Sequence, residues 1–403
     1  MKVQCCIVGG GPAGMMLGYL LGRAGVETLV LEKHKDFLRD FRGDTVHPST
    51  LRIMQELGLL EDFWKQPHSK LRALSVEIEG RTFQVADFGR VPTPGHCIVL
   101  MPQWDFLNFM MQKGSRFASL KVMMSSEATR LTESAGRVSG VEATTPDGAL
   151  SVSADLVVAC DGRSSTMRKA AGLQAHSLGS PIDVLWFRLS KKDADPEQVL
   201  GHLERDKMLV TIDRNDYWQC AYVISKGGID RVHANGLEAF KRAVADGAKF
   251  LADRVDELKS FEDVKLLSVS VDRLLSWSKP GLLCIGDAAH AMSPVGGVGI
   301  NLAIQDAVAT ANVFAAKLRA GSLRDAELDA VRRRRLLPVK VIQRMQTTVH
   351  KRVLQPVVSG QQQTLKVPWV IKLLDRTPWM RRWPAQFIGL GVRSEHVRSP
   401  QAA

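Results

Sequence analysis

The first 33 residues constrain the fold more than any other stretch, because they alternate strand, turn, helix and strand. An apolar run of strand length, Val3–Val8, leads directly into a glycine-rich turn, residues 9–14. Met15–Ala24 is predicted to be a helix, and Thr28–Leu31 a second strand that ends at Glu32. This order predicts a βαβ unit whose turn opens the helix.

Three glycines of that turn lie where a bound dinucleotide needs them. Gly9 permits the tight turn, Gly11 lets the backbone reach a pyrophosphate, and Gly14 lets helix and strand pack closely. The helix N-terminus adds unpaired N–H groups and a positive dipole end, and Glu32 is placed to accept hydrogen bonds from an adenosine ribose. The alternative is a glycine-rich turn in an ordinary α/β domain. The predicted dinucleotide-binding residues are Gly9, Gly11, Pro12, Ala13, Gly14, Glu32 and Lys33.

Length and composition describe an ordinary globular chain. Its 403 residues can form two or three domains, and 45% hydrophobic and 24% charged residues are typical of such proteins. The first strand begins at Val3, which leaves no room for a signal peptide, and no apolar run has transmembrane length, so we predict a cytoplasmic protein. The six cysteines form no CxxC or other metal-binding spacing. We therefore expect buried free thiols and no metal site.

The net charge of +12 is concentrated at one end of the chain. The segment from Arg332 onward contains fifteen Lys and Arg residues and two acidic residues, a local charge of +13. The rest of the chain therefore carries a charge of −1. Three interpretations stay open: solvated helix faces, attraction of an anionic nucleotide or acidic partner, and transient contact with an anionic membrane through Trp369, Trp379 and Trp383. Nucleic acid binding is not expected, because no recognition module accompanies the charge.

Two further buried strands, Leu156–Cys160 and Leu282–Ile285, share the character of the first, and β-rich segments separate them. The predicted fold class is α/β, with a discontinuous Rossmann-like domain, a smaller β-sheet domain and a helical C-terminal segment. The first domain is predicted to contain residues 1–70, 97–180 and 273–325. The second contains 71–96 and 181–272, and the basic helical segment contains 326–403.

Two finer expectations concern local structure. Lys121–Met124, Gly136–Thr145 and Ala149–Val152 are predicted to form a meander of short strands, separate from the strand at Leu156. The basic tail is predicted to be a series of helices interrupted by its prolines, which are Pro338, Pro356, Pro368, Pro378 and Pro384.

Two motifs after the later strands complete a recognisable set. The first is Asp161-Gly162-x-x-Ser165-x-x-Arg168. The second runs from Gly286-Asp287-Ala288-Ala289-His290 through Pro294, Gly297 and Gly299 to Asn301. Together with the opening turn, in this order, they resemble the single-component FAD-dependent aromatic hydroxylases, the para-hydroxybenzoate hydroxylase-like family. The resemblance covers roughly Met1 to Ala320, and it implies that the turns at Gly11, Asp161 and Asp287 converge on one flavin.

The resemblance implies a role for each motif. Asp287 accepts hydrogen bonds from the ribityl chain, and the side-chain-poor stretch from Pro294 lets a flat ring approach the backbone. The helix that begins near Gly299 aims its amides at the N1 and O2 edge of the flavin, where reduced flavin carries negative charge. Asp161 and Gly162 lie near the pyrophosphate and the nicotinamide cofactor. The cofactor residues added by the resemblance are Arg42, Gln103, Asp161, Gly162, Asp287, Pro294, Gly297, Val298, Gly299, Ile300 and Asn301.

The implied activity is that of an FAD-dependent monooxygenase. NADPH or NADH reduces FAD, O2 adds at C4a, and the hydroperoxyflavin hydroxylates an aromatic or polycyclic small molecule. No second glycine fingerprint exists, so NAD(P)H is expected to bind transiently over the same cleft. No acid or base is strictly required, and His47 is the single candidate for catalysis. Candidate substrate residues are Val46, His47, Trp218 and Pro294.

Departures from the family pattern limit the substrate. The strands between residues 208 and 224 lack the arginine–tyrosine set that would anchor a benzoate carboxylate, which favours a neutral, larger or polycyclic ring. Three alternatives to a hydroxylase are kept open. One is a related flavin-dependent reductase of double bonds, another is a flavin-binding protein without turnover, and the third is a halogenase, whose Trp-x-Trp-x-Ile-Pro motif is absent.

Overall fold

The computed structural model describes residues 1–38, 45–196, 201–359 and 367–402. Its main sheet has the strand order β19-β20-β11-β1-β2-β8, and the five strands from β20 to β8 are parallel. The central strands are apolar on both faces because helices and a β-hairpin cover them. The strands are β1 (Lys2–Val8), β2 (Thr28–Leu31), β8 (Leu120–Met123), β11 (Gly148–Ala159), β19 (Ser278–Lys279) and β20 (Leu282–Cys284).

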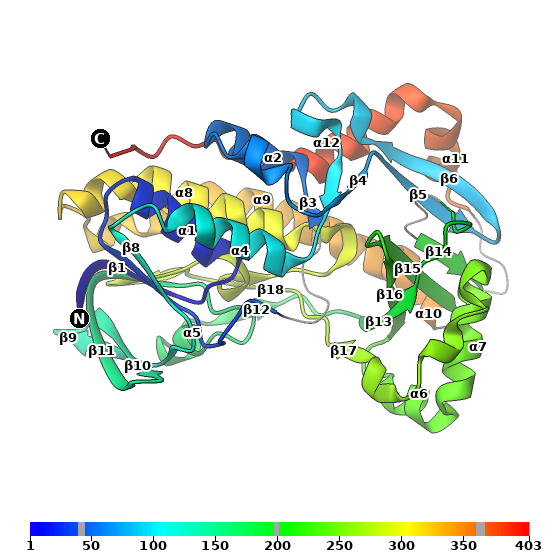
Figure 1. Cartoon of the computed structure of the whole chain (residues 1–403), viewed down its shortest axis with the longest axis horizontal. Helices are drawn as coiled ribbons and strands as arrows, with labels where there is room; N and C mark the ends of the chain where they lie inside the picture. Colours follow the sequence, from blue (N-terminus) through cyan, green and yellow to red (C-terminus); the bar gives the residue numbers. More distant parts are fainter. Residues whose placement is uncertain (39–44, 197–200, 360–366, 403) are drawn as a thin grey trace.

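Helices α1 (Pro12–Arg23), α4 (Gln103–Gly114) and α8 (Gly299–Arg319) lie together over one face of this sheet (Figure 1). The helix α8 is almost entirely buried, since α1 lies on one side of it and α9 (Asp329–Val349) on another. The segment Val295–Arg319 is long and apolar enough to cross a membrane by length and composition. However, 83% of its most apolar window is buried within the fold, as in a core helix.

The strand β11 corrects the predicted meander. Gly148–Ser153 pairs antiparallel with β10 (Arg137–Thr145), and Ser153–Ala159 pairs parallel with β1, so the two predicted strands form one. The first half alternates exposed and buried residues, whereas the second half is buried on both faces, which made one strand look like two. The strand β8 is also not part of the meander, because it pairs with β2 at the edge of the main sheet. The hairpin partner of β10 is β9 (Glu127–Ser134).

A second sheet of seven strands has the order β17-β13-β16-β15-β14-β5-β6. One face packs against α6 (Ile229–Asn235) and α7 (Leu237–Gly247), and the other packs toward the first domain. The hairpin of β5 (Ala73–Ile78) and β6 (Arg81–Asp87) joins this sheet, which supports the predicted assignment of 71–96, although the exact domain boundaries stay a prediction. The remaining strands are β13 (Ile182–Ser190), β14 (Gly201–Glu204), β15 (Lys207–Asp213), β16 (Tyr217–Ser225) and β17 (Lys265–Leu267).

Two small sheets connect these parts. One contains β3 (Thr45–Val46), β4 (Ser69–Leu71) and β7 (Ile98–Leu100), and α2 (Pro48–Glu56) follows β3 directly. The other contains β12 (Ala175–Ser177), β18 (Asp272–Leu274) and β21 (His290–Ala291).

The tail is helical, as predicted, but its prolines do not all interrupt it. Pro338 lies inside the 21-residue helix α9, and Pro384 lies inside α12 (Arg382–Leu390). A proline in a helix interior removes one hydrogen bond and costs about 3 kcal/mol, which burial of one side of α9 against α8 offsets. Between α9 and α12 lie a π-helical turn (His350–Leu354), α10 (Gln355–Val358) and α11 (Trp369–Arg376). Residues 391–402 then return along the first domain as a strap, and the N–H of Ala402 donates to Arg23 O.

Candidate flavin site

The first turn has the geometry that its glycines predicted. Gly9 has φ +103°, and a Cβ there would lie 2.5 Å from the carbonyl oxygen of Cys160. At Gly14 a Cβ would lie 1.9 Å from the carbonyl oxygen of Gly9, so the helix packs directly on the turn. At Gly11 a Cβ would meet no described atom within 4 Å. Two of the glycines are therefore required by packing, and the third faces open space.

Contacts between the three turns confirm that they converge. The Cβ position of Gly9 is 2.9 Å from Cα of Asp161, and that of Gly286 is 3.1 Å from Cβ of Ala13. The guanidinium of Arg163 lies 3.7 Å from the carboxylate of Asp287. Each turn thus contacts the other two, because the parallel strands β1, β11 and β20 end at the same edge of the sheet.

Glu32 is fixed at the end of β2 by the backbone. Its carboxylate accepts hydrogen bonds from the N–H of Gly10 (2.9 Å) and of His34 (3.0 Å), and the residue is only 8% exposed. These two hydrogen bonds orient the Glu32 carboxylate at the carboxyl end of β2. Its contact with the ribose stays a prediction.

The second turn is shaped by its own aspartate. The Asp161 carboxylate accepts hydrogen bonds from the Ser165 hydroxyl (2.5 Å) and from the N–H of Met167 (3.1 Å). Met167 lies in the first turn of the short helix α5 (Thr166–Ala170). Gly162 has φ +82°, a conformation that favours glycine. The side chains of this motif therefore hold a backbone shape, and the contact of Asp161 and Gly162 with a cofactor stays a prediction.

The glycine loop, residues 294–299, is held from two sides. Gly297 has φ +61°, and a Cβ there would lie 2.3 Å from the Thr45 hydroxyl, which donates to Gly297 O at 2.8 Å. From α9, the Gln346 amide accepts from the N–H of Ser293 (3.1 Å) and donates to the carbonyls of Ser293 and Val295 (both 2.9 Å). These contacts fix the backbone shape of the loop from both sides, as close approach of a flat ring requires.

Asn301 joins this loop to the elements beside it. Its amide oxygen accepts from the N–H of His47 and from the Thr50 hydroxyl, both at 2.8 Å. Its amide nitrogen donates to the carbonyls of Thr45 (3.0 Å) and Gly297 (3.3 Å). Because the side chain is used inside the protein, only its backbone remains for the predicted flavin contact. The first turn of α8 has no acidic residue and no side-chain cap, which leaves amides of that turn for an anionic ligand edge.

His47 is a buried neutral imidazole. It is 1% exposed, and burial lowers its pKa to about 4 although the Ile388 carbonyl favours the protonated form. The Nδ1–H donates to that carbonyl at 2.9 Å, and Nε2 is buried without a hydrogen-bond partner among the described residues. At neutral pH His47 can therefore accept a hydrogen bond at Nε2 but does not carry a proton to donate from that atom.

The lowered pKa predicts that His47 destabilises the fold in acid. Between an unfolded pKa near 6.5 and a folded pKa of about 4, the unfolded chain binds more protons, so stability falls as the pH falls. Between pH 7.5 and pH 5, this single residue should lower the free energy of unfolding by about 2 kcal/mol. We expect His47→Gln to lose about that much of the pH dependence of the free energy of unfolding, measured by urea denaturation. The exposed His176→Gln should keep the wild-type dependence, and equal dependence in all three proteins would contradict the prediction.

A buried ion network behind the loop escaped the sequence interpretation. Asp306 on α8 is fully buried and accepts from His290 Nε2 (2.6 Å), from the N–H of Gly286 (3.1 Å) and from Arg335 Nε (2.8 Å). Burial alone would raise the pKa of Asp306, but His290 and Arg335 hold it below its usual value. Arg335 lies 3.8 Å from Glu395 of the strap, so the network joins the third turn to the tail. A charged residue within the apolar run 302–308 was the available signal.

One predicted substrate residue, Trp218, is not brought to this site. It is 1% exposed, packs edge-on against Phe250, and donates its indole N–H to Asp195 at 2.7 Å. It lies on the face of the second sheet that α7 covers, away from the first domain, so it is a core residue. Both faces of that sheet are apolar, so alternation does not identify the ligand side. Val46 is also 1% exposed, but it lies between Thr45 and His47, which bond to the glycine loop and to Asn301, and its contact with a substrate stays a prediction.

The other predicted residues that the structure describes lie at the ends of several elements. Pro294 is half-buried at the start of the glycine loop, and Gln103 is half-buried at the start of α4. Lys33 is exposed just after β2, and Arg42 lies outside the described residues. Pro12 and Ala13 begin α1, and Val298, Gly299 and Ile300 begin α8. Their contacts with a cofactor stay predictions.

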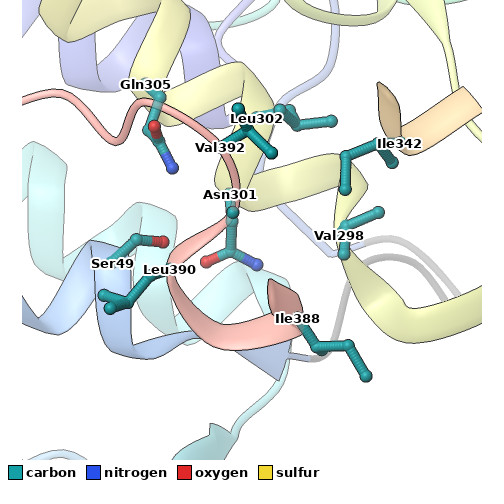
Figure 2. A pocket seen from close by; sticks show the side chains of 10 residues that line it. Ser49, Val298, Asn301, Leu302, Gln305, Ile342, Ile388, Leu390 and Val392 are labelled. Atoms are coloured by element: carbon teal, nitrogen blue, oxygen red, sulfur yellow. The ribbon is translucent and has the colours of Figure 1, made fainter. Parts of the chain in front are cut away.

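A small, partly open pocket of about 20 Å³ lies beside the start of α8. Figure 2 shows Asn301 in the middle of the lining residues, with Val298 and Ile342 to its right, Ser49 and Leu390 to its left, and Ile388 of α12 below. Helix α12 and the strap therefore form one wall of the region around His47.

Comparisons with known proteins agree with this geometry. The model of the FAD binding domain family matches residues 2–345. The 6-methylpretetramide 4-monooxygenase of Streptomyces rimosus is 32% identical over 396 residues, 98% of this chain and 94% of that protein. The dialkyldecalin synthase of Streptomyces rugosporus is 24% identical over 333 residues, 76% of this chain and 64% of that longer protein. The solved structure of an anhydrotetracycline hydroxylase from Streptomyces rimosus has a TM-score of 0.75 at 24% identity, covering 98% of this chain and 77% of that one.

The chain therefore belongs to the FAD binding domain family. It is an FAD-dependent monooxygenase, and the comparisons support this activity over a double-bond reductase or a protein without turnover. The open space at Gly11, the uncapped starts of α1 and α8, and the contacts among the three turns fit an FAD that extends from α1 to the glycine loop. When bound, FAD supplies the electron transfer from NAD(P)H and the activation of O2.

Proposed function

We propose that this enzyme hydroxylates a neutral, polycyclic aromatic molecule, similar to the substrates named for its relatives, 6-methylpretetramide and anhydrotetracycline. The observation that carries the proposal is the 32% identity, over nearly the whole chain, to 6-methylpretetramide 4-monooxygenase. Where the second sheet meets the first domain, Trp186, Ile212 and Ala221 pack with Leu100 of β7 and Ala385 of α12 in a buried cluster, the apolar wall. An apolar environment suits a large ring system, because burial of ring surface then supplies the binding energy.

Arg214 does not provide the carboxylate anchor that small benzoate substrates need. It is 6% exposed, and its Nε donates to the Gln219 side chain at 3.2 Å. This internal use supports a neutral substrate, since a site built for a carboxylate presents an accessible guanidinium. We further propose that NADH or NADPH binds transiently over the same cleft, and that the enzyme works in the cytoplasm. All six cysteines are free and buried, which suits a reducing compartment.

Within the site, the protein's own residues position rather than react. The amides at the start of α8 would stabilise negative charge on the flavin edge, and the loop residues would hold the ring flat. We propose that His47, whose Nε2 is buried, holds α12 beside the ring through its hydrogen bond to the Ile388 carbonyl and does not touch the substrate itself. A pKa of about 4 makes proton abstraction by His47 inefficient at neutral pH.

Oxygen transfer can be tested with labelled O2. The FAD-loaded enzyme should consume NAD(P)H faster when a tetracyclic phenol is added, and the product should gain one labelled oxygen atom by mass spectrometry. Para-hydroxybenzoate, a small carboxylate substrate, should not accelerate consumption. Faster consumption with para-hydroxybenzoate, or a tetracyclic product without label, would contradict the proposed substrate class.

A further inference from the structure

The C-terminal helices present an unusual exposed surface. Among the described residues, the strongly exposed large hydrophobic side chains include a group of five within fifteen positions of the chain. We call this group the tryptophan patch: Trp369 (74% exposed), Val370, Leu373, Trp379 (54%) and Trp383 (49%). Exposed aromatic clusters of this kind mark interaction surfaces, because isolated exposed hydrophobic residues are the normal case.

The helix α11 has two different faces. Its inner side packs on the second sheet, where Ile371 joins a cluster with Phe83, and Asp375 accepts from the N–H of Gln84 at 3.2 Å. Its outer stripe follows helical spacing, with Trp369 and Leu373 alternating with Lys372 and Arg376, and all four side chains are exposed.

The patch continues into the next turn of chain. Trp379 lies in the turn Pro378–Arg381 and packs edge-on against Trp383 of α12, with 5.5 Å between ring centroids. Figure 1 shows α11 and its connection to α12 at the end of the molecule opposite the two termini. This end is therefore accessible to a large flat partner.

The charged residues of the segment that carries the patch are almost all basic. Lys372, Arg376 and Arg382 are exposed, and Asp375 is the single acid between residues 367 and 390. That acid is already used, since it bonds the backbone of β6 and lies 3.7 Å from Arg381. The surface thus combines indole rings with uncompensated positive charge, the chemistry that suits the boundary between water and an anionic lipid layer.

A second copy of the chain fits this surface poorly. A symmetric dimer through the patch would place the same bases opposite one another, with no acid to pair them. We propose that the tryptophan patch docks the enzyme reversibly on an anionic lipid membrane, with the indoles at the interface and the bases near the headgroups.

The docking helices are continuous with the flavin site. Ala385 of α12 is buried against the apolar wall, and a Cβ at Gly389 would lie 2.9 Å from Pro48 at the start of α2. The carbonyl of Ile388, on the same helix, holds His47. Docking would therefore bring the cleft close to a lipid phase in which apolar polycyclic molecules concentrate, although docking itself does not depend on the substrate.

Vesicle flotation with the FAD-loaded enzyme tests the proposal. The enzyme should float with vesicles that contain 30% phosphatidylglycerol in phosphatidylcholine at low salt, but much less with pure phosphatidylcholine. Because salt screens charges beyond about 10 Å at 0.1 M, raising the salt should release it. The triple variant Trp369→Ser/Trp379→Ser/Trp383→Ser and the variant Lys372→Glu/Arg376→Glu should each lower the bound fraction at least about tenfold, the triple variant by removing the interfacial indoles.

The control variant changes an exposed hydrophobic residue that lies outside the patch. Leu275→Ser removes an equally exposed side chain (64%), and it should leave flotation unchanged. All variants should retain wild-type FAD content. No flotation of the wild type at low salt, or flotation that the patch variants do not change, would overturn the proposal. Self-association of the wild type that the tryptophan substitutions abolish would assign the patch to a second copy and overturn it as well.

Discussion

Gly11→Ala is expected to weaken FAD binding at least about tenfold, equivalent to about 1.4 kcal/mol, while the apoprotein stays folded. Gly11 has φ −71°, which alanine adopts without strain, and a Cβ there would meet no described atom within 4 Å. The methyl group would instead occupy the space in which the pyrophosphate approaches the backbone. Titration of the apoprotein with FAD, followed by flavin fluorescence, gives the affinity, and urea unfolding gives the stability.

Gly14→Ala is the matched comparison, three residues away on the same turn. Its Cβ would lie 1.9 Å from Gly9 O, so the helix must move away from the strand. We expect a loss of about 3 kcal/mol of folding free energy, the upper range for overpacking, and loss of FAD together with it. If Gly11→Ala bound FAD as tightly as the wild type, the pyrophosphate would not lie at this turn. If Gly14→Ala matched the wild type, the close packing would be wrong.

The second large effect is expected at Asp306. Asp306→Asn keeps the shape but removes the negative charge that pairs with Arg335, and both residues are 0% exposed. Breaking a buried ion pair typically costs about 3–5 kcal/mol, because it leaves a buried charge without its partner. Glu395, 3.8 Å from Arg335, compensates part of that charge, so we expect a loss of about 3 kcal/mol. The free energy of unfolding of the apoprotein measures it.

Two further variants separate this explanation from a general loss of packing. Adding Arg335→Gln to Asp306→Asn removes the uncompensated charge, and it should restore a large part of the stability. The exposed pair Arg130–Glu142, with N and O atoms 2.6 Å apart, is the control: Arg130→Ala should change stability by less than about 1 kcal/mol. A double variant no more stable than Asp306→Asn alone would show that charge is not the cause.

The sequence predicted those parts of the site that depend on backbone conformation. Gly9, Gly14 and Gly297 each lie where a side chain would collide with another segment. Such positions require glycine, so they can be recognised in the sequence without knowledge of distant contacts. The convergence of the turns followed from a general rule, since parallel strands end at one edge of a sheet. Local requirements of this kind can be inferred from residue type and spacing alone.

What the sequence did not predict depends on partners that are distant in the chain. Asp306, Arg335 and Glu395 carry no local pattern that pairs them, and their contacts exist only once α8, α9 and the strap have packed. The prediction that Trp218 contacts substrate was wrong for a related reason. Both faces of its sheet are buried, so the alternation of residues along the strand does not show which face is near a ligand. Pro338 remained helical because packing of α9 outweighs the cost of one lost hydrogen bond.

The strap has a consequence for how the protein is made. Its backbone bonds to Glu56, Asn312 and Arg23, and Arg334 binds Glu395 through two parallel hydrogen bonds, so residues synthesised late fasten helices synthesised early. The strand β1 must likewise wait for β11, and β11 for β20. During translation, the N-terminal glycine turn is therefore synthesised long before the segments that pack against it. Chaperones that shield apolar strands should therefore matter more for the yield of this protein than for proteins whose domains are contiguous.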